Sequence, residues 1–171
     1  MAQTGEATKW IENQEFFNQL SMSEKQEAGS FSFIWGVFEL QVMTILQKAQ
    51  PYPSMSLSVA RDYAVSQHLP DCDLSEEKAY FRAHFFESDG AERSTWPGAS
   101  FREHDRADEI KDVLLNSSVD HSKDAEILIR VVYRFRNNFF HGYKWAYRLQ
   151  GQAKNFANSS SVLIKLMPQF S

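Results

Sequence analysis

The chain of 171 residues lacks most of the features that mark a secreted or membrane protein. Its single cysteine, Cys72, excludes an internal disulfide framework and fits a reducing compartment. No run reaches the roughly 18 apolar residues of a membrane span. The segment that starts at Met1 has no basic region followed by an apolar one, so we expect no signal peptide. The sequence therefore predicts a soluble, cytoplasmic protein that does not bind membranes.

Glycine, proline and strand patterns are also scarce. The 7 glycines and 5 prolines leave few turns, which favours helices. No stretch alternates apolar and polar residues as a strand would, and there is no internal repeat. Aromatic residues are plentiful at 14%, and hydrophobic residues at 43% suffice for a sizeable core. We expect a single domain over residues 1–171.

The motifs of familiar metal and cofactor sites are missing. The sequence has no Gly-rich phosphate loop, no zinc-ligand spacing and no local signature of a Ser/His/Asp site. His84 and Glu87 share a predicted helix, and His104 precedes Asp105, but neither pair has the further ligands that a metal needs. We therefore expect no metal and no cofactor.

The pattern that is present throughout the chain is the helical period. Apolar residues recur at steps of three and four in several stretches. Ser23 and Ser75 are candidate helix caps, and residues 88–99 form the clearest loop. The sequence predicts an all-α bundle. Its helices are expected over residues 8–20, 23–47, 56–68, 75–87, 100–115, 122–140 and 152–167.

Charge is divided unevenly along the chain, although the net charge is only −4. Residues 1–121 carry 10 basic and 20 acidic side chains, whereas residues 122–171 carry 8 basic and 2 acidic ones. Two explanations remain open. The basic part binds an anionic partner, or it pairs with the acidic part inside the fold.

The predicted helix over residues 122–140 has two different sides. At about 100° per residue, one side gathers the apolar residues Leu128, Val131, Val132, Phe135 and Phe139. The opposite side gathers Arg130, Tyr133, Arg134, Arg136, Asn137, Phe140 and His141. Three guanidinium groups on one side repel each other unless an anion or a partner's carboxylate lies against them.

This second side of the helix suits the phosphates of RNA. Arginine presents a planar fork to two phosphate oxygens and keeps its charge, and histidine exchanges a proton near pH 7. Arg136 would stabilise charge on the nonbridging oxygens, while His141 takes the 2′-hydroxyl proton or protonates the leaving oxygen. Neither step needs a metal. Nearby candidates to bind RNA or line the site are Arg130, Tyr133, Arg134, Tyr143 and Lys144.

The spacing of Arg136 and His141 sets a condition on such a site. They are five residues apart, so about 140° separates them on a straight helix. They can meet only if the helix ends or bends near His141, which Gly142 allows, or if a second copy completes the site. A twofold dimer would bring two such pairs together.

The segment Arg-Asn-Asn-Phe-Phe-His-Gly at residues 136–142 resembles the Arg-x4-6-His signature of HEPN domains. It differs at one position, Phe139 for Leu, from the subgroup motif Arg-Asn-Asn-Leu-Phe-His-Gly. The helix that contains Phe31 and Trp35 and the last predicted helix also resemble the family layout. The close resemblance covers about residues 23–48 and 122–168, and residues 50–120 are treated as a family-variable part.

The resemblance implies a HEPN-like bundle of about four to six helices, with the motif near the C-terminal end of the penultimate helix and dimerisation through the motif face. It implies a metal-independent ribonuclease of prokaryotic defence or toxin type, with Arg136, His141 and Asn137 in the site. A toxin subgroup extends the motif to His-x-Tyr, which Tyr143 matches. In that subgroup a nucleotidyltransferase partner adenylylates the tyrosine, so an antitoxin or nucleotidyltransferase partner is implied.

Two other functions stay open. A noncatalytic HEPN module would use the same basic helix to bind RNA, a nucleotide or a partner protein. A helical DNA-binding regulator is less favoured, because no short helix-turn-helix with a basic second helix is present and residues 1–121 are acidic.

Overall fold

The computed structural model describes residues 5–47, 54–117, 119–140 and 149–167. Within these ranges the chain is helical, and one isolated bridge joins Phe86 to Glu92. The all-α class predicted from the sequence is confirmed. The helices of the described residues are α1 (Glu6–Glu12), α2 (Glu15–Asn18), α3 (Met22–Ile45), α4 (Leu57–Ala64), α5 (Ser75–Phe85), α6 (Thr95–Gly98), the 3-10 helix η1 (Glu103–Asp105), α7 (Ala107–Leu115), α8 (His121–Phe140) and α10 (Ala153–Leu166).

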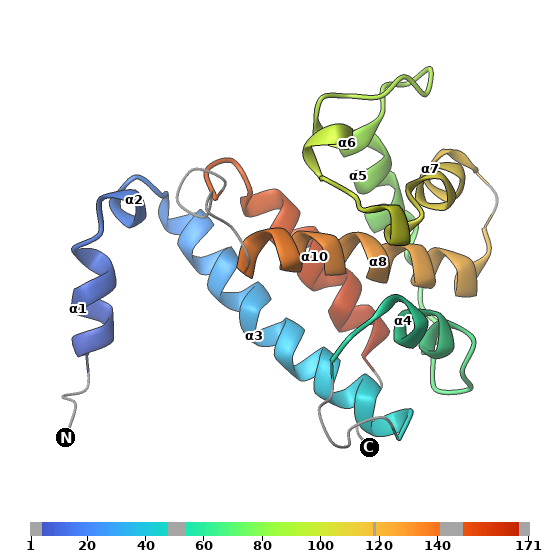
Figure 1. Cartoon of the computed structure of the whole chain (residues 1–171), viewed down its shortest axis with the longest axis horizontal. Coiled ribbons are helices and arrows are strands. Elements are labelled where there is room, and N and C mark those ends of the chain that lie inside the picture. The colour runs from blue at the N-terminus through green and yellow to red at the C-terminus, as the bar shows by residue number, and fades with distance from the viewer. Residues whose placement is uncertain (1–4, 48–53, 118, 141–148, 168–171) are drawn as a thin grey trace.

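Three long helices form the centre of the molecule (Figure 1). The helices α3 and α10 pack against each other, and α8 crosses them. The shorter helices α4, α5 and α7 pack against α8, so that α8 touches helices from both halves of the chain. The N-terminal helix α1 extends away from this body, whereas Phe17 of α2 packs against the core. Neither helix contains a fully buried residue.

Aromatic side chains connect α8 to its neighbours. Near the end of α8 the ring of Phe139 lies 6.4 Å from that of Phe31 on α3 and 5.2 Å from that of Phe156 on α10. One turn earlier, Phe135 stacks on Phe85 of α5 at 6.1 Å, with the ring planes 9° apart. Burying one such ring contributes about 1.5–3 kcal/mol. These contacts fix the three long helices and α5 relative to one another.

The long helix α3 has one buried and one exposed side. Phe31, Trp35 and Phe38, which recur at the predicted helical period, are buried. On the other side Phe33 and Leu40 are 75% and 61% exposed. This helix is long and apolar enough to cross a membrane by length and composition, a test that the core helix of a soluble protein also passes. Its buried aromatic side packs in the core.

Polar side chains fix where the helices begin, and two of these starts differ from the prediction. The cap of α3 is Ser21 and not Ser23. The Ser21 hydroxyl accepts from the Glu24 amide at 3.2 Å, and the Glu24 carboxylate accepts from the Ser21 amide at 2.7 Å. Ser75 is the first residue of α5 rather than its cap, and its amide donates to the Asp73 carboxylate at 2.9 Å.

Two predicted helices are interrupted. The helix expected over residues 8–20 divides into α1 and α2, because Gln14 is extended, with φ −86° and ψ 125°. The helix expected over residues 100–115 begins only at α7, because Arg106 has a φ of 53°, which a right-handed helix cannot contain. The loop expected over residues 88–99 also contains the short helix α6. These two predicted helices are thus shorter or divided in the structure.

Candidate functional site

The helix α8, which carries the sequence motif, is enclosed along most of its length. Every residue from Asp124 to Val132 is buried. The helices α5 and α10 pack on its apolar side, and α4 and α7 also pack against it. Along this part of α8, the basic side that the periodicity identifies is therefore covered by other parts of the chain.

Arg130 is 2% exposed and is bound by oxygens from three elements. Its Nη1 donates to Glu126 Oε1 at 3.0 Å and to Glu109 Oε2 at 2.8 Å. Its Nη2 donates to the carbonyl oxygens of Asp105 and Arg106. The hydrogen bond from Arg130 is the largest cause that lowers the pKa of Glu109. Arg130 thus ties η1 and α7 to α8.

Arg134 is 3% exposed, and its Nη2 donates to Asp105 Oδ2. The Asp105 carboxylate also accepts from the Arg102 amide at 2.6 Å. A guanidinium group taken out of water is stable only when it is paired and hydrogen-bonded. Carboxylates from within the chain therefore enclose both guanidinium groups, and the role of Arg130 and Arg134 at an RNA site stays a prediction.

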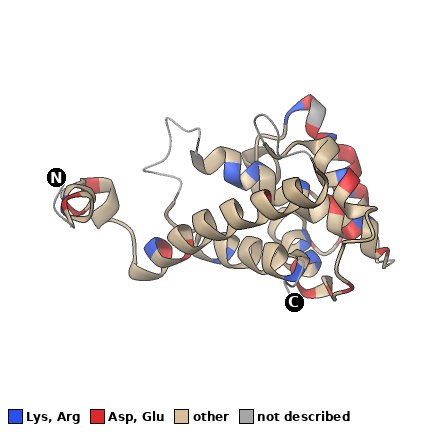
Figure 2. Ribbon diagram, turned by 90° about the horizontal axis from the view of Figure 1, so that it is seen from below, with Lys and Arg blue, Asp and Glu red and all other residues tan. Residues whose placement is uncertain are grey.

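The uneven charge of the chain is partly resolved by these contacts. Besides Arg130 and Arg134, Lys165 of α10 lies 2.8 Å from the carboxylate of Glu77 on α5. In each case a cation of residues 122–171 meets an acid of residues 1–121. Figure 2 shows that charged residues gather at the end of the molecule opposite to the N-terminus. For these residues, pairing inside the fold explains the charge division without an anionic partner.

Arg136 has a different environment at the C-terminal end of α8. Its side chain is half-buried, with the guanidinium carbon 5.8 Å from the centre of the Trp35 ring. Its Nη1 donates to Asn137 Oδ1 at 3.1 Å, and the ring of Tyr133 lies 6.0 Å from that of Trp35. The structure therefore brings three predicted site residues together beside an indole of α3. A guanidinium close to the face of an indole ring interacts favourably with it.

The remaining predicted site residues, His141, Tyr143 and Lys144, lie outside the described residues. Among the residues that the structure does describe, no group of three or more His, Cys, Asp or Glu side chains could hold a metal ion. The chemistry available at the described end of α8 is therefore that of a guanidinium, an amide and aromatic rings.

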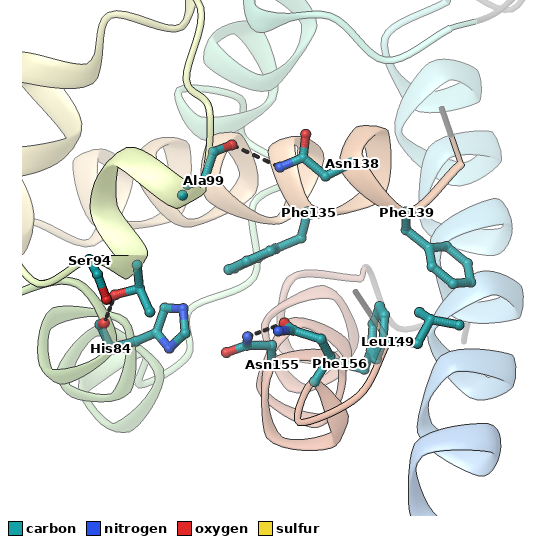
Figure 3. A pocket seen from close by; sticks show the side chains of 12 residues that line it. His84, Ser94, Ala99, Phe135, Asn138, Phe139, Leu149, Asn155 and Phe156 are labelled. Carbon is teal, nitrogen blue, oxygen red and sulfur yellow. Dashed lines mark hydrogen bonds between the residues drawn. The ribbon is translucent and has the colours of Figure 1, made fainter. Parts of the chain in front are cut away.

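A pocket of about 330 Å³ lies on another side of α8, between α5, α6 and α10 (Figure 3). This volume is within the range of small-molecule sites, roughly 300–1,000 Å³. No Lys, Arg, Asp or Glu is among the described residues that line it. The lining residues are His84, Ser94, Thr95, Gly98, Ala99, Phe135, Asn138, Phe139, Leu149, Gln152, Asn155 and Phe156.

His84 is held in this pocket by aromatic rings. Its imidazole is parallel to the Tyr80 ring at 6.0 Å and edge-on to the rings of Phe85 and Phe135, at 4.8 and 6.0 Å. Burial and then the charge of Arg93 hold the pKa of His84 below its usual range. This shift favours the neutral imidazole, which has one nitrogen that donates and one that accepts.

Amide groups of the pocket are fixed by hydrogen bonds. The Tyr80 hydroxyl donates to Asn155 Oδ1 at 2.6 Å, and Asn155 Nδ2 donates to Gln152 Oε1 at 2.5 Å. On the opposite side Asn138 Nδ2 donates to the carbonyl oxygen of Ala99 at 2.8 Å, as Figure 3 shows. The pocket thus combines aromatic walls with amide groups of defined orientation.

Little in the amino-acid sequence indicates this pocket. Asn138 and Phe139 belong to the motif at residues 136–142, but no site role was expected for them. In the sequence, His84 is singled out only by its spacing from Glu87, and that pair has too few ligands to hold a metal ion. The other lining residues come from helices far apart in the chain, so no spacing within one segment joins them.

Comparison of the chain with protein-family models, with curated proteins and with solved structures finds no match.

Proposed function

We propose that this chain is a metal-independent, HEPN-type ribonuclease that cleaves RNA through its own 2′-hydroxyl group. The observation that carries the proposal is the position of Arg136 at the end of α8. Of the three arginines of this helix, Arg130 and Arg134 are 2% and 3% exposed, whereas Arg136 is half-buried beside Asn137 and Trp35. It is also the arginine that begins the motif at residues 136–142.

The proposed reaction needs two proton transfers, one from the 2′-hydroxyl group and one to the leaving 5′-oxygen. His141 takes the proton of the 2′-hydroxyl, whose oxygen then attacks the adjacent phosphorus. The bond from phosphorus to the 5′-oxygen breaks, that oxygen takes up a proton from water, and His141 then returns its proton to the solvent. Arg136 stabilises the charge on the nonbridging oxygens, and Asn137 positions the guanidinium through its hydrogen bond. The products carry a 2′,3′-cyclic phosphate and a 5′-hydroxyl.

The proposal extends to the assembly of the protein. Because Arg136 and His141 are about 140° apart on a straight helix, a second copy that docks at the motif end of α8 would complete the site. We place this homodimer in the cytoplasm. A toxin role adds an antitoxin or a nucleotidyltransferase that modifies Tyr143.

The test is cleavage of total RNA and of tRNA in the presence of EDTA, with analysis of the product ends. Arg136→Ala and His141→Ala should each lower the rate by about a hundredfold or more. Arg93→Ala and His68→Ala are matched controls at exposed positions, and both should cleave as the wild type does. Unfolding curves of all variants would separate loss of chemistry from loss of fold.

Two outcomes would contradict the proposal. Cleavage that survives both Arg136→Ala and His141→Ala would place the reaction elsewhere. A wild-type protein that binds RNA without cutting it would instead support the noncatalytic binding module.

A further inference from the structure

We propose that the pocket between α5, α6, α8 and α10 binds an uncharged, planar heteroaromatic molecule of about the size of a purine base. The inference does not rest on ribonuclease activity, because the pocket uses residues other than Arg136, Asn137 and Trp35. Its lining instead includes Asn138 and Phe139 of the same helix.

The walls of the pocket favour a flat ring. Phe135 and His84 project toward each other from α8 and α5, and Asn155 of α10 lies beside them (Figure 3). Phe139 and Phe156 add aromatic surface at the other end of the pocket. Aromatic faces pack well against other rings in stacked or edge-on arrangements. A planar ligand would use these faces with little loss of conformational freedom.

The polar groups of the pocket favour a ring with both donors and acceptors at its edge. The Gln152 carboxamide turns its oxygen to Asn155, so its amide nitrogen is directed to other partners. The neutral imidazole of His84 offers one donor and one acceptor. The Thr95 hydroxyl donates to the carbonyl oxygen of His84, which fixes α6 against α5 at this edge. A purely apolar ring would leave these polar groups without compensation for lost water.

The absence of charged residues from the described lining argues against an anionic ligand. A phosphate or carboxylate group in a partly enclosed pocket needs a cation or several donors, or its desolvation is unfavourable. The pocket supplies neither Lys nor Arg among its described residues. The lack of a cation among the described lining residues therefore favours the ring system over an attached phosphate.

The test is calorimetric titration of the full chain with adenine, AMP and indole. Adenine should bind, AMP should bind no more tightly than adenine, and indole should bind at least about tenfold more weakly, because it lacks ring acceptors. No heat with adenine at millimolar concentration would overturn the proposal. If AMP binds tenfold more tightly than adenine, the inference that the ligand is uncharged is wrong. If indole binds as tightly as adenine, the polar groups of the pocket do not contribute to recognition.

Two substitutions locate the binding site. A side chain at Gly98 would meet no atom within 4 Å at its Cβ, so Gly98→Leu can enter the pocket without forcing the fold. It should weaken adenine binding by at least about tenfold. Gly29→Leu on α3 also enters open space and is the matched control. It should leave adenine binding unchanged, and unchanged binding in Gly98→Leu would show that adenine binds elsewhere.

A third substitution tests the polar contact. His84→Leu keeps the bulk of the side chain and removes both ring nitrogens, so it should also weaken adenine binding by at least about tenfold. His68→Leu, at an exposed position, should bind adenine as the wild type does. If a folded His84→Leu variant binds adenine as tightly as the wild type, His84 does not contribute to the proposed binding site.

Discussion

At the scale of single residues, Arg134 shows how a charged side chain becomes part of a core. Its guanidinium is buried against the Asp105 carboxylate, and the pair joins α8 to η1. Replacing Arg134 would leave the buried Asp105 carboxylate without its cation. The free-energy cost of such an unpaired buried charge is far larger than the stabilisation that an exposed ion pair provides. The pair therefore contributes to the stability of the fold.

We expect Arg134→Met to lower the free energy of unfolding by about 3–5 kcal/mol. Methionine has a similar length, so the change removes mainly the charge and the hydrogen bonds. Arg93→Met is the control, because Arg93 forms its pair with Glu87 at the surface, with side chains 44% and 53% exposed. That variant should lose about 0–1 kcal/mol in urea unfolding. Equal effects of the two substitutions would contradict the structural role of Arg134.

The partners of the buried arginines were only partly predictable from the sequence. Glu126 lies four residues before Arg130, which is a local signal for an ion pair within one helix. Asp105 and Glu109 are 29 and 21 residues away from the arginines they bind. Periodicity describes one helix at a time, so it shows that a side is charged but not that another element will cover it.

At the scale of elements, the start of α3 depends on one serine of two that the sequence offers. Ser21→Ala removes the hydroxyl that accepts from the Glu24 amide and should lower the free energy of unfolding by about 1 kcal/mol. Ser23→Ala is the matched control inside the helix and should leave stability unchanged or raise it slightly. Thermal and urea unfolding would distinguish them, and a larger loss in Ser23→Ala would contradict the observed cap.

The helices themselves were well predicted where apolar residues recur over several turns. The period that runs through Phe31, Trp35 and Phe38 marks the buried side of α3, as observed. The break before α7 could not be predicted in this way. Arg106 adopts its left-handed conformation next to Asp105, whose carboxylate is held by Arg134. The left-handed conformation of Arg106 therefore lies next to an ion pair between residues 29 positions apart, and no local pattern in the sequence shows that pair.

At the scale of the whole molecule, the N-terminal helix contributes little to the packed body. α1 buries no residue and extends away from the rest of the chain (Figure 1). Deleting residues 1–13 should change the free energy of unfolding by no more than about 0.5 kcal/mol. Deleting residues 1–20 also removes Leu20, which is 5% exposed, and should cost about 1.5–3 kcal/mol. A large loss on the shorter deletion would contradict this description of α1.

The packing of the two halves against each other makes the chain suitable for use as a split protein. A cut after Ser117 would separate an acidic fragment, which contains α3 and α7, from a basic fragment, which contains α8 and α10. Each fragment would lack the helices that cover its apolar side chains, and also the counterions of its buried charges. The fragments would fold only on each other, so fusing them to two separate proteins would report whether those proteins meet.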